Sequence, residues 1–167
     1  MAIKTKTVIT IPKVESLENQ TLVLACSEQH VQLAQQIAIN AIVEKPKRYT
    51  MRPVFGAVNC LAFNDRKNFV PTLDVIKKYI QHEGVNHIVI ICHSCCAADK
   101  RANRSATVTE SVQFQFKKAN KAKQIILTAL AGHCKELKVD VYVLVERKQF
   151  HLQKEVVPRA KKVAAAA

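Results

Sequence analysis

Short apolar runs alternate with longer segments of mixed polarity along this chain. The runs 21–25 and 87–91 are continuously apolar, which is typical of parallel strands that are buried on both faces. Pro53 and Gly56 interrupt another apolar segment, which is therefore predicted to be an irregular or edge strand. The predicted strands are 21–25, 50–58, 87–91, 139–145 and 150–156, the last as a strand or hairpin arm.

Between these strands, apolar residues recur at the spacing of helices. Three helices are predicted, over 31–42, 71–83 and 107–131. Pro71 suits the first turn of the second helix, where a missing backbone N–H does no harm. Thr107 and Glu110 have the spacing of a capping box at the start of the third helix, which is expected to stop at Gly132.

Strands that alternate with helices predict an α/β fold, with a mostly parallel central β-sheet flanked by helices. We divide the chain into an extended N-terminal arm (1–20), one α/β domain (21–157) and a basic, Ala-rich tail (158–167). In such a sheet, ligands gather beyond the carboxyl ends of the strands. Cys26 ends one predicted strand and the segment 92–96 ends another, so their cysteines are expected at the same edge of the sheet.

The composition limits the class of protein. A length of 167 residues suits one compact domain, and a hydrophobic share of 49% is enough for a real core. Aromatic residues make up only 5%, which argues against the stacking platforms of single-strand-binding proteins. No apolar run approaches the roughly 18–20 residues that span a bilayer, so no membrane partner is expected.

The cysteines indicate the compartment. Three of the six lie in the pentapeptide 92–96, where adjacent residues are poorly placed to pair with one another. We therefore expect thiols or metal ligands in the cytoplasm or another reducing intracellular compartment. Organellar import stays open, because Lys4, Lys6 and Lys13 precede the first acidic residue, Glu15.

Two kinds of chemistry fit the segment 92–96. His93 and Cys96 have an H-x-x-C spacing that could aim both at one metal ion, and Cys26 could complete a Cys₂His set for zinc. Cys26 could instead be a small buried core residue, a common fate of cysteine. Cys92 and Cys95 also form a C-x-x-C pair at the end of a strand, the place of a redox pair.

The stretches LVLACSEQH (22–30) and HIVIICHSCC (87–96) resemble those of β-class carbonic anhydrases, which carry C-x-D-x-R and H-x-x-C after two strands. The resemblance covers about 21–156. It implies a β-carbonic-anhydrase-like fold in which Cys26, His93 and Cys96 bind Zn²⁺. It also implies a homodimer and the reversible hydration of carbon dioxide to bicarbonate.

The same motif departs from the family at its catalytic pair. Glu28 stands where the family has Asp, and His30 stands where it has Arg. Glu28 is one methylene longer and could reach the zinc ion itself, which would close the site. His30 lacks a permanent charge and cannot offer the two-pronged hydrogen bonding of a guanidinium group. The expected function is therefore zinc binding, with hydration activity that is weak or lost.

The charge supports an alternative function. Lysines and arginines number 26 against 13 acidic residues, a formal net charge of +13. Basic patches attract phosphate backbones. A catalytically inactive scaffold in a nucleic-acid-containing or other polyanionic assembly would use such a surface. The candidate contact residues are Lys100, Arg101, Arg104, Lys117, Lys118, Lys121 and Lys123.

Overall fold

The computed structural model describes residues 21–43, 49–54, 56–63, 69–100, 107–147 and 149–154. Its centre is a five-stranded sheet in the order β2-β1-β3-β4-β5, in which only β5 runs antiparallel to its neighbour. The strands are β1 (Thr21–Cys26), β2 (Tyr49–Val54), β3 (His87–His93), β4 (Lys138–Glu146) and β5 (Phe150–Lys154). The predicted α/β class with a mostly parallel sheet is confirmed.

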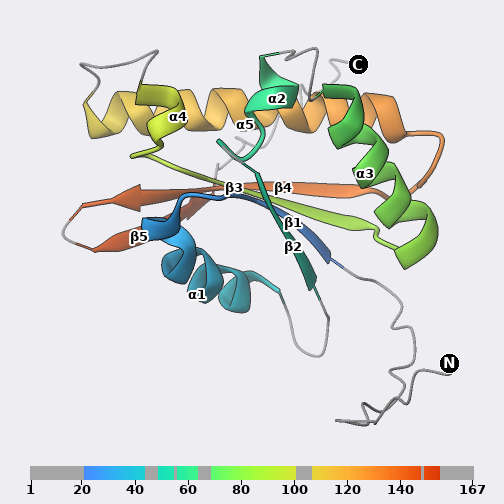
Figure 1. The fold of residues 1–167 in the computed structure, drawn as a ribbon, viewed down its shortest axis with the longest axis horizontal. Coiled ribbons are helices and arrows are strands. Elements are labelled where there is room, and N and C mark those ends of the chain that lie inside the picture. Colours follow the sequence, from blue (N-terminus) through green and yellow to red (C-terminus); the bar gives the residue numbers. More distant parts are fainter. Residues whose placement is uncertain are drawn as a thin grey trace, which may run out of the picture.

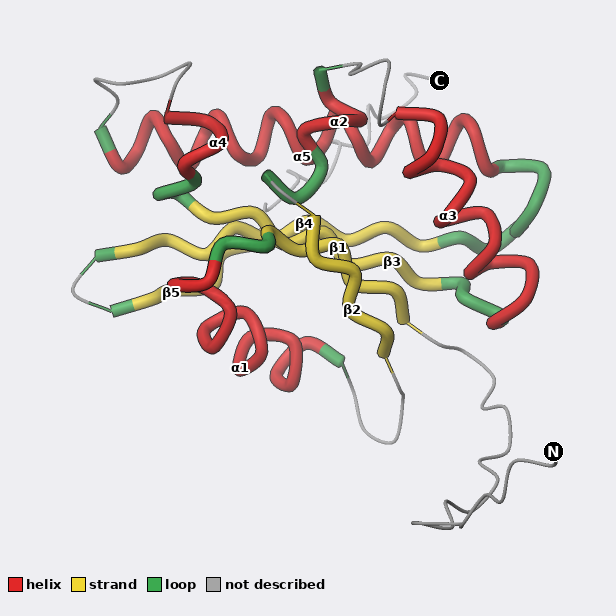
Figure 2. The backbone as a smooth tube through the Cα atoms, in the orientation of Figure 1, coloured by secondary structure: helices red, strands yellow, loops and turns green. Residues whose placement is uncertain are grey.

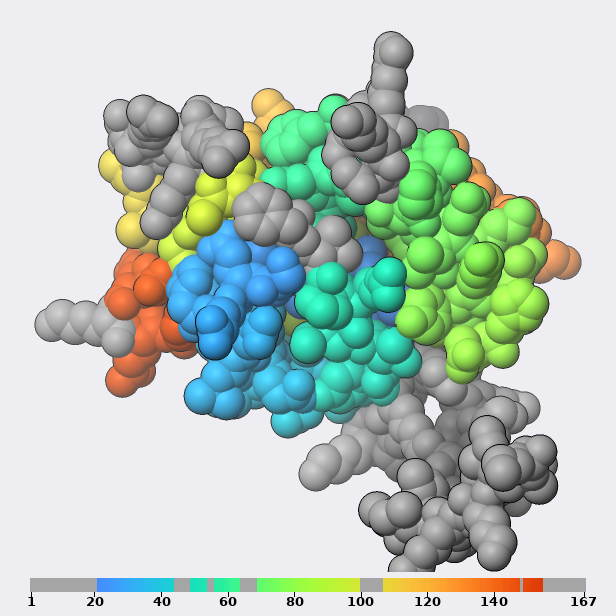
Figure 3. Space-filling model, viewed as in Figure 1, coloured from blue at the N-terminus to red at the C-terminus, as the bar shows by residue number. Residues whose placement is uncertain are grey.

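Helices cover the two faces of the sheet unequally (Figures 1 and 2). One face carries α1, which follows the short 3-10 turn η1 (Gln29–Val31), and the other face carries the remaining helices. In the space-filling view, α1 in blue and β2 in teal form neighbouring parts of one surface (Figure 3). The helices are α1 (Gln32–Ile42), α2 (Asn59–Ala62), α3 (Phe69–Glu83), α4 (Ala97–Lys100) and α5 (Val108–Leu130).

The central strands form a core on both sides of the sheet, as their continuous apolar runs predict. All six residues of β1 are buried, and the last six of β3 are buried as well. Alternate residues of each strand contribute to opposite clusters, because successive side chains of a strand point to opposite faces. Leu22 and Ile88 pack beneath the larger helical layer, whereas Val23 and Val89 pack with α1.

The ends of two elements follow the chemistry of their sequences. Thr107 caps α5, and the side chain of Glu110 accepts a hydrogen bond of 2.7 Å from the backbone N–H of Thr107, which confirms the capping box. The predicted edge strand ends at Val54, and Gly56 follows in a left-handed turn with φ of 69°. A Cβ atom on Gly56 would lie 2.2 Å from the side chain of Asn59, so this turn requires glycine.

Several sequence expectations fall outside the described residues. They are the N-terminal arm (1–20), the basic tail (158–167), and Arg101 and Arg104 of the basic set. None of the helices in the described part of the chain is both long and apolar enough to cross a membrane.

Candidate metal centre

The candidate site lies where the direction of chain connection changes within the sheet. From β1 the chain crosses by way of α1 to β2 on one side, whereas β3 is connected through α4 and α5 to β4 on the other side. A crevice at the carboxyl ends of β1 and β3 is therefore the expected ligand position in an open sheet of this order. Cys26 is the last residue of β1 and His93 is the last residue of β3.

Four side chains meet at this switch point. The ligand atoms of Cys26, Glu28, His93 and Cys96, which we call the inner cluster, all lie within 4.8 Å of one another, and this set could hold a metal ion. Nε2 of His93 is fully buried, has no hydrogen-bond partner in the described part of the chain, and lies 3.8 Å from Oε1 of Glu28. An unpartnered buried imidazole nitrogen is costly without a ligand, so the donor set fits a cation such as zinc.

The pKa values of the two cysteines of the inner cluster are shifted in opposite directions. A hydrogen bond from the Cys96 thiol to Cys26 lowers the pKa of Cys26 to about 3, against the effect of burial. The same hydrogen bond, followed by burial, raises the pKa of Cys96. The lowered pKa of Cys26 favours a thiolate in a place that is closed to solvent, where a bound cation would neutralise it.

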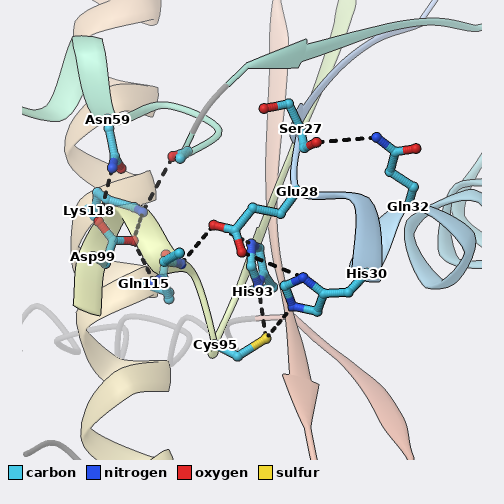
Figure 4. A network of polar contacts seen from close by, with 12 residues as sticks. Ser27, Glu28, His30, Gln32, Asn59, His93, Cys95, Asp99, Gln115 and Lys118 are labelled. Carbon is cyan, nitrogen blue, oxygen red and sulfur yellow. Dashed lines mark hydrogen bonds and ion pairs between the residues drawn. The ribbon is translucent and has the colours of Figure 1, made fainter. Parts of the chain in front are cut away.

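Glu28 and His30, which follow Cys26 in the chain, both lie beside His93 of the inner cluster (Figure 4). Oε1 of Glu28 accepts a hydrogen bond of 2.7 Å from the backbone N–H of Ala97, the first residue of α4. Nδ1 of His30 lies 3.7 Å from Oε2 of Glu28, but the His30 side chain is half exposed, whereas that of Glu28 is only 10% exposed. The carboxylate thus points into the inner cluster while His30 borders it.

Cys95 lies between two histidines on the outer side of the same site. Its Sγ atom is 3.2 Å from Nδ1 of His93 and 3.3 Å from Nε2 of His30. These three residues, the outer cluster, also have ligand atoms within 4.8 Å of one another. The two clusters therefore share His93, which presents one ring nitrogen to each (Figure 4).

The redox interpretation of Cys92 and Cys95 receives no support. Burial raises the pKa of Cys92 to about 11 and is the main cause that raises the pKa of Cys95 to about 12. A reactive redox pair needs a lowered thiol pKa instead. Cys92 belongs to the core beneath the large helical layer, whereas Cys95 lies between two histidines, so the two side chains have different surroundings.

Backbone contacts fix the loop that carries these residues. The Ser94 N–H donates to the carbonyl of Leu144 at 2.9 Å, and the Ser94 hydroxyl accepts from the Glu146 N–H at 3.0 Å. Both partners belong to β4, so the turn after β3 is tied to the neighbouring strand. The N–H of Asp99 donates to the carbonyl of Cys96 at 3.1 Å, which joins the last inner ligand to α4.

A buried polar network lies behind α4. The Asp99 carboxylate forms an ion pair with Lys118 of α5 and accepts hydrogen bonds from Asn59 at 3.0 Å and Gln115 at 2.8 Å. Burial opposes ionisation of Asp99, but the charge and hydrogen bond of Lys118 outweigh it and lower the pKa of this carboxyl group. The turn that carries Cys96 is therefore anchored to α2 and α5.

This network corrects one part of the polyanion hypothesis. Lys118 is only 4% exposed and is committed to Asp99, so it belongs to no basic surface. The periodicity of α5 explains the error, because Lys118 lies on the inward face with Gln115 and Ala122, whereas Lys117 and Lys121 are exposed. Lys123 is partly buried, and the side chain of Lys100 is outside the described set.

A second polar cluster occupies the opposite end of β3 and was missed in the sequence. We call it the amino-end cluster. Nε2 of His87 and the Nζ atoms of Lys138 and Lys154 each lie 3.0 Å from a carboxylate oxygen of Asp140. The cluster lines a cavity of about 380 Å³. Its members are Thr21, His87, Lys138, Asp140 and Lys154. The available signal was the alternation of Lys138 and Asp140 within an otherwise apolar strand, which places both on one face.

Comparisons with known proteins leave the family open. No family model and no curated protein matches the sequence. The fold is similar to a β-carbonic anhydrase of the filamentous ascomycete Sordaria macrospora, described as tetrameric, with 14% identity, 80% coverage of each chain and a TM-score of 0.47. It is also similar to one of Aspergillus fumigatus, with 13% identity, coverage of 84% of this chain and 78% of that chain, and a TM-score of 0.46. These likenesses are too weak to transfer an activity, so the site's chemistry rests on its own residues.

Proposed function

We propose that this chain is a zinc-binding protein whose metal ion is held by Cys26, His93 and Cys96, with Glu28 in the fourth position. The unpartnered Nε2 atom of His93, buried against two thiols and a carboxylate, is the observation that carries the proposal. Thiolate, imidazole and carboxylate are the ligands that zinc prefers, and four of them complete a tetrahedral set.

Glu28 determines what the site can do. When bound, zinc supplies the Lewis acidity that gives a water molecule in an open coordination position a pKa of about 7. Glu28 competes for that position, because Ala97 holds its carboxylate beside His93. His30 is too exposed to draw the carboxylate away as a buried guanidinium group would. We therefore expect hydration of carbon dioxide to be weak or absent.

The zinc content of the purified protein tests the ligand assignment. Protein prepared without chelator or metal-affinity resin should retain one zinc ion per chain through dialysis against metal-free buffer. Cys96→Ser should lose this ion, because a neutral hydroxyl replaces a thiolate ligand. Cys134→Ser is the matched control, because Cys134 packs against the core outside both clusters, and it should keep the full zinc content. Equal zinc in both variants would refute the assignment.

Replacing Glu28 and His30 with the Asp and Arg of β-class carbonic anhydrases tests whether Glu28 closes the fourth position on zinc. The double variant Glu28→Asp/His30→Arg shortens the carboxylate and supplies a guanidinium group to hold it. Its rate of carbon dioxide hydration, followed by stopped-flow proton release, should rise roughly tenfold or more above that of the wild type. Glu28→Asp alone should give a smaller increase. An unchanged rate at full zinc occupancy would show that the loss lies elsewhere in the site.

The homodimer implied by the motif resemblance remains a prediction. Sedimentation velocity of the zinc-loaded protein would test it directly.

A further inference from the structure

We propose that the outer cluster of His30, His93 and Cys95 is a second metal site, selective for zinc or a similar transition metal that prefers nitrogen and sulfur ligands. This inference rests on the proposed function in one respect: if zinc fills the inner cluster, His93 bridges two ions. Nε2 of His93 faces the inner cluster, while Nδ1 lies beside Cys95.

The spacing of the three ligand atoms suits one ion. Bond lengths of about 2.3 Å to sulfur and about 2.0 Å to nitrogen place these atoms about 3.5 Å apart in a tetrahedral site. Sγ of Cys95 already lies 3.2 Å from His93 and 3.3 Å from His30. The planes of the His30 and His93 rings meet at 78°, with centroids 5.7 Å apart, so their nitrogens approach the thiol from different directions.

The outer cluster differs from the inner one in its access to solvent. His30 is half exposed and Cys95 is partly exposed, whereas Cys26, His93 and Cys96 are buried. Three protein ligands leave one tetrahedral position for water, which is the arrangement of open sites. We therefore expect the outer ion to bind more weakly than the inner ion and to exchange with added metal.

Charge allows the two ions to lie close together. The thiolates of Cys26 and Cys96 and the carboxylate of Glu28 would over-neutralise one divalent inner ion, so the inner site presents no net positive charge to a second ion. Binding of the outer ion displaces the proton of the Cys95 thiol. With both sites filled, it also displaces the remaining ring proton of His93, and both protons pass to solvent.

Metal titration of the full chain tests the second site. Zinc-retaining protein is titrated with Co²⁺, and thiolate-to-cobalt absorption, bound metal and released protons are recorded together. The wild type should bind one cobalt ion beyond the resident zinc and release two protons. Cys95→Ser should lose that ion and its absorption while keeping the zinc, and His30→Ala should weaken cobalt binding at least about tenfold. Cys134→Ser should behave as the wild type.

The four outcomes are distinct. No added cobalt in the wild type, or equal cobalt in Cys95→Ser, overturns the outer site and leaves the inner one intact. A single ion that is lost in Cys95→Ser but kept in Cys96→Ser supports the outer site and refutes the inner one. An ion lost only in Cys96→Ser overturns the outer proposal, and the absence of any bound metal overturns both.

Discussion

The two ends of β3 carry histidines of opposite character. His87, at the amino end, has one ring nitrogen 3.0 Å from Asp140 and the other 3.5 Å from the hydroxyl of Thr21. His93, at the carboxyl end, contacts Cys95 through one nitrogen, and the other has no hydrogen-bond partner in the described part of the chain. The polar groups of the first end are paired with one another, whereas the second end leaves Nε2 of His93 without a hydrogen-bond partner among the described residues.

Whether the buried polar groups have partners within the protein distinguishes a structural cluster from a ligand site better than the residue types do. Both ends contain a histidine and a carboxylate, but among the described residues only the carboxylate of the amino end is paired with lysines, Lys138 and Lys154. A buried polar atom that is left unsatisfied costs about 1–3 kcal/mol. The carboxyl end therefore has a reason to bind a cation, and the amino end has none.

The largest effect on stability is expected at the ion pair of Asp99 and Lys118 behind α4. This pair is as deeply buried as the inner cluster, but its two charges neutralise each other. Lys118→Met leaves the Asp99 carboxylate without its counter-charge, and we expect a loss of about 3–5 kcal/mol in the free energy of unfolding. Urea denaturation measures it. The adjacent exposed lysine provides the control, because Lys117→Met should change stability by no more than about 0.5 kcal/mol.

A double change confirms the physical cause. Asp99→Asn/Lys118→Met removes both charges, so it should recover most of the stability lost in the single variant. If the double variant is as unstable as Lys118→Met, the hydrogen bonds of the Lys118 ammonium group rather than charge compensation hold α4 in place.

Zinc should stabilise the protein through one end of β3 only. With free zinc at about 100 times its dissociation constant, the free energy of unfolding of the metal-stripped protein should rise by about 2.7 kcal/mol. Asp140→Asn should show the same increase, because Asp140 lies outside both candidate metal clusters. Cys96→Ser should show little of it. Denaturation with and without zinc measures all three, and an equal response of Cys96→Ser would break the distinction between the two ends.

The fold was largely predictable because its signals are local. The continuous apolar runs of β1 and β3 are typical of strands that are buried on both faces, and the capping box marks the start of α5. The short helices α2 and α4 escaped prediction, since each has four residues and too little sequence for a periodic pattern. They form because tertiary contacts hold them, as Asn59 and Asp99 hold each other.

Only those residues of the candidate site that the order of strands brings to one edge of the sheet were predictable. Parallel strands deliver Cys26, His93 and Cys96 to one edge, so their meeting follows from the pattern. The burial of Lys118 does not, because a lysine in a basic helix gives no local sign that an aspartate lies opposite it. The role of Cys95 between two histidines also depends on how η1 places His30, which no spacing in the sequence specifies.

The smallest expected effect belongs to the amino end and depends on pH. Burial alone would raise the pKa of Asp140, but hydrogen bonds from Lys138, Lys154 and His87 lower it from 3.8 to about 2. A lowered pKa in the folded protein means that this stability is fully present above pH 4 and is lost as the pH falls toward 2. Because the lysines are more than half exposed, we expect about 1–2 kcal/mol rather than the full value of the shift.

Asp140→Asn should therefore be less stable than the wild type by about 1–2 kcal/mol at pH 7, and the difference should shrink between pH 4 and pH 2. Urea denaturation across this range measures the difference. Glu136→Gln is a suitable control, because this carboxylate lines the same cavity outside the cluster and should leave the pH dependence unchanged. A constant difference at every pH would mean that Asp140 acts through packing, and the amino-end cluster would then lose its electrostatic basis.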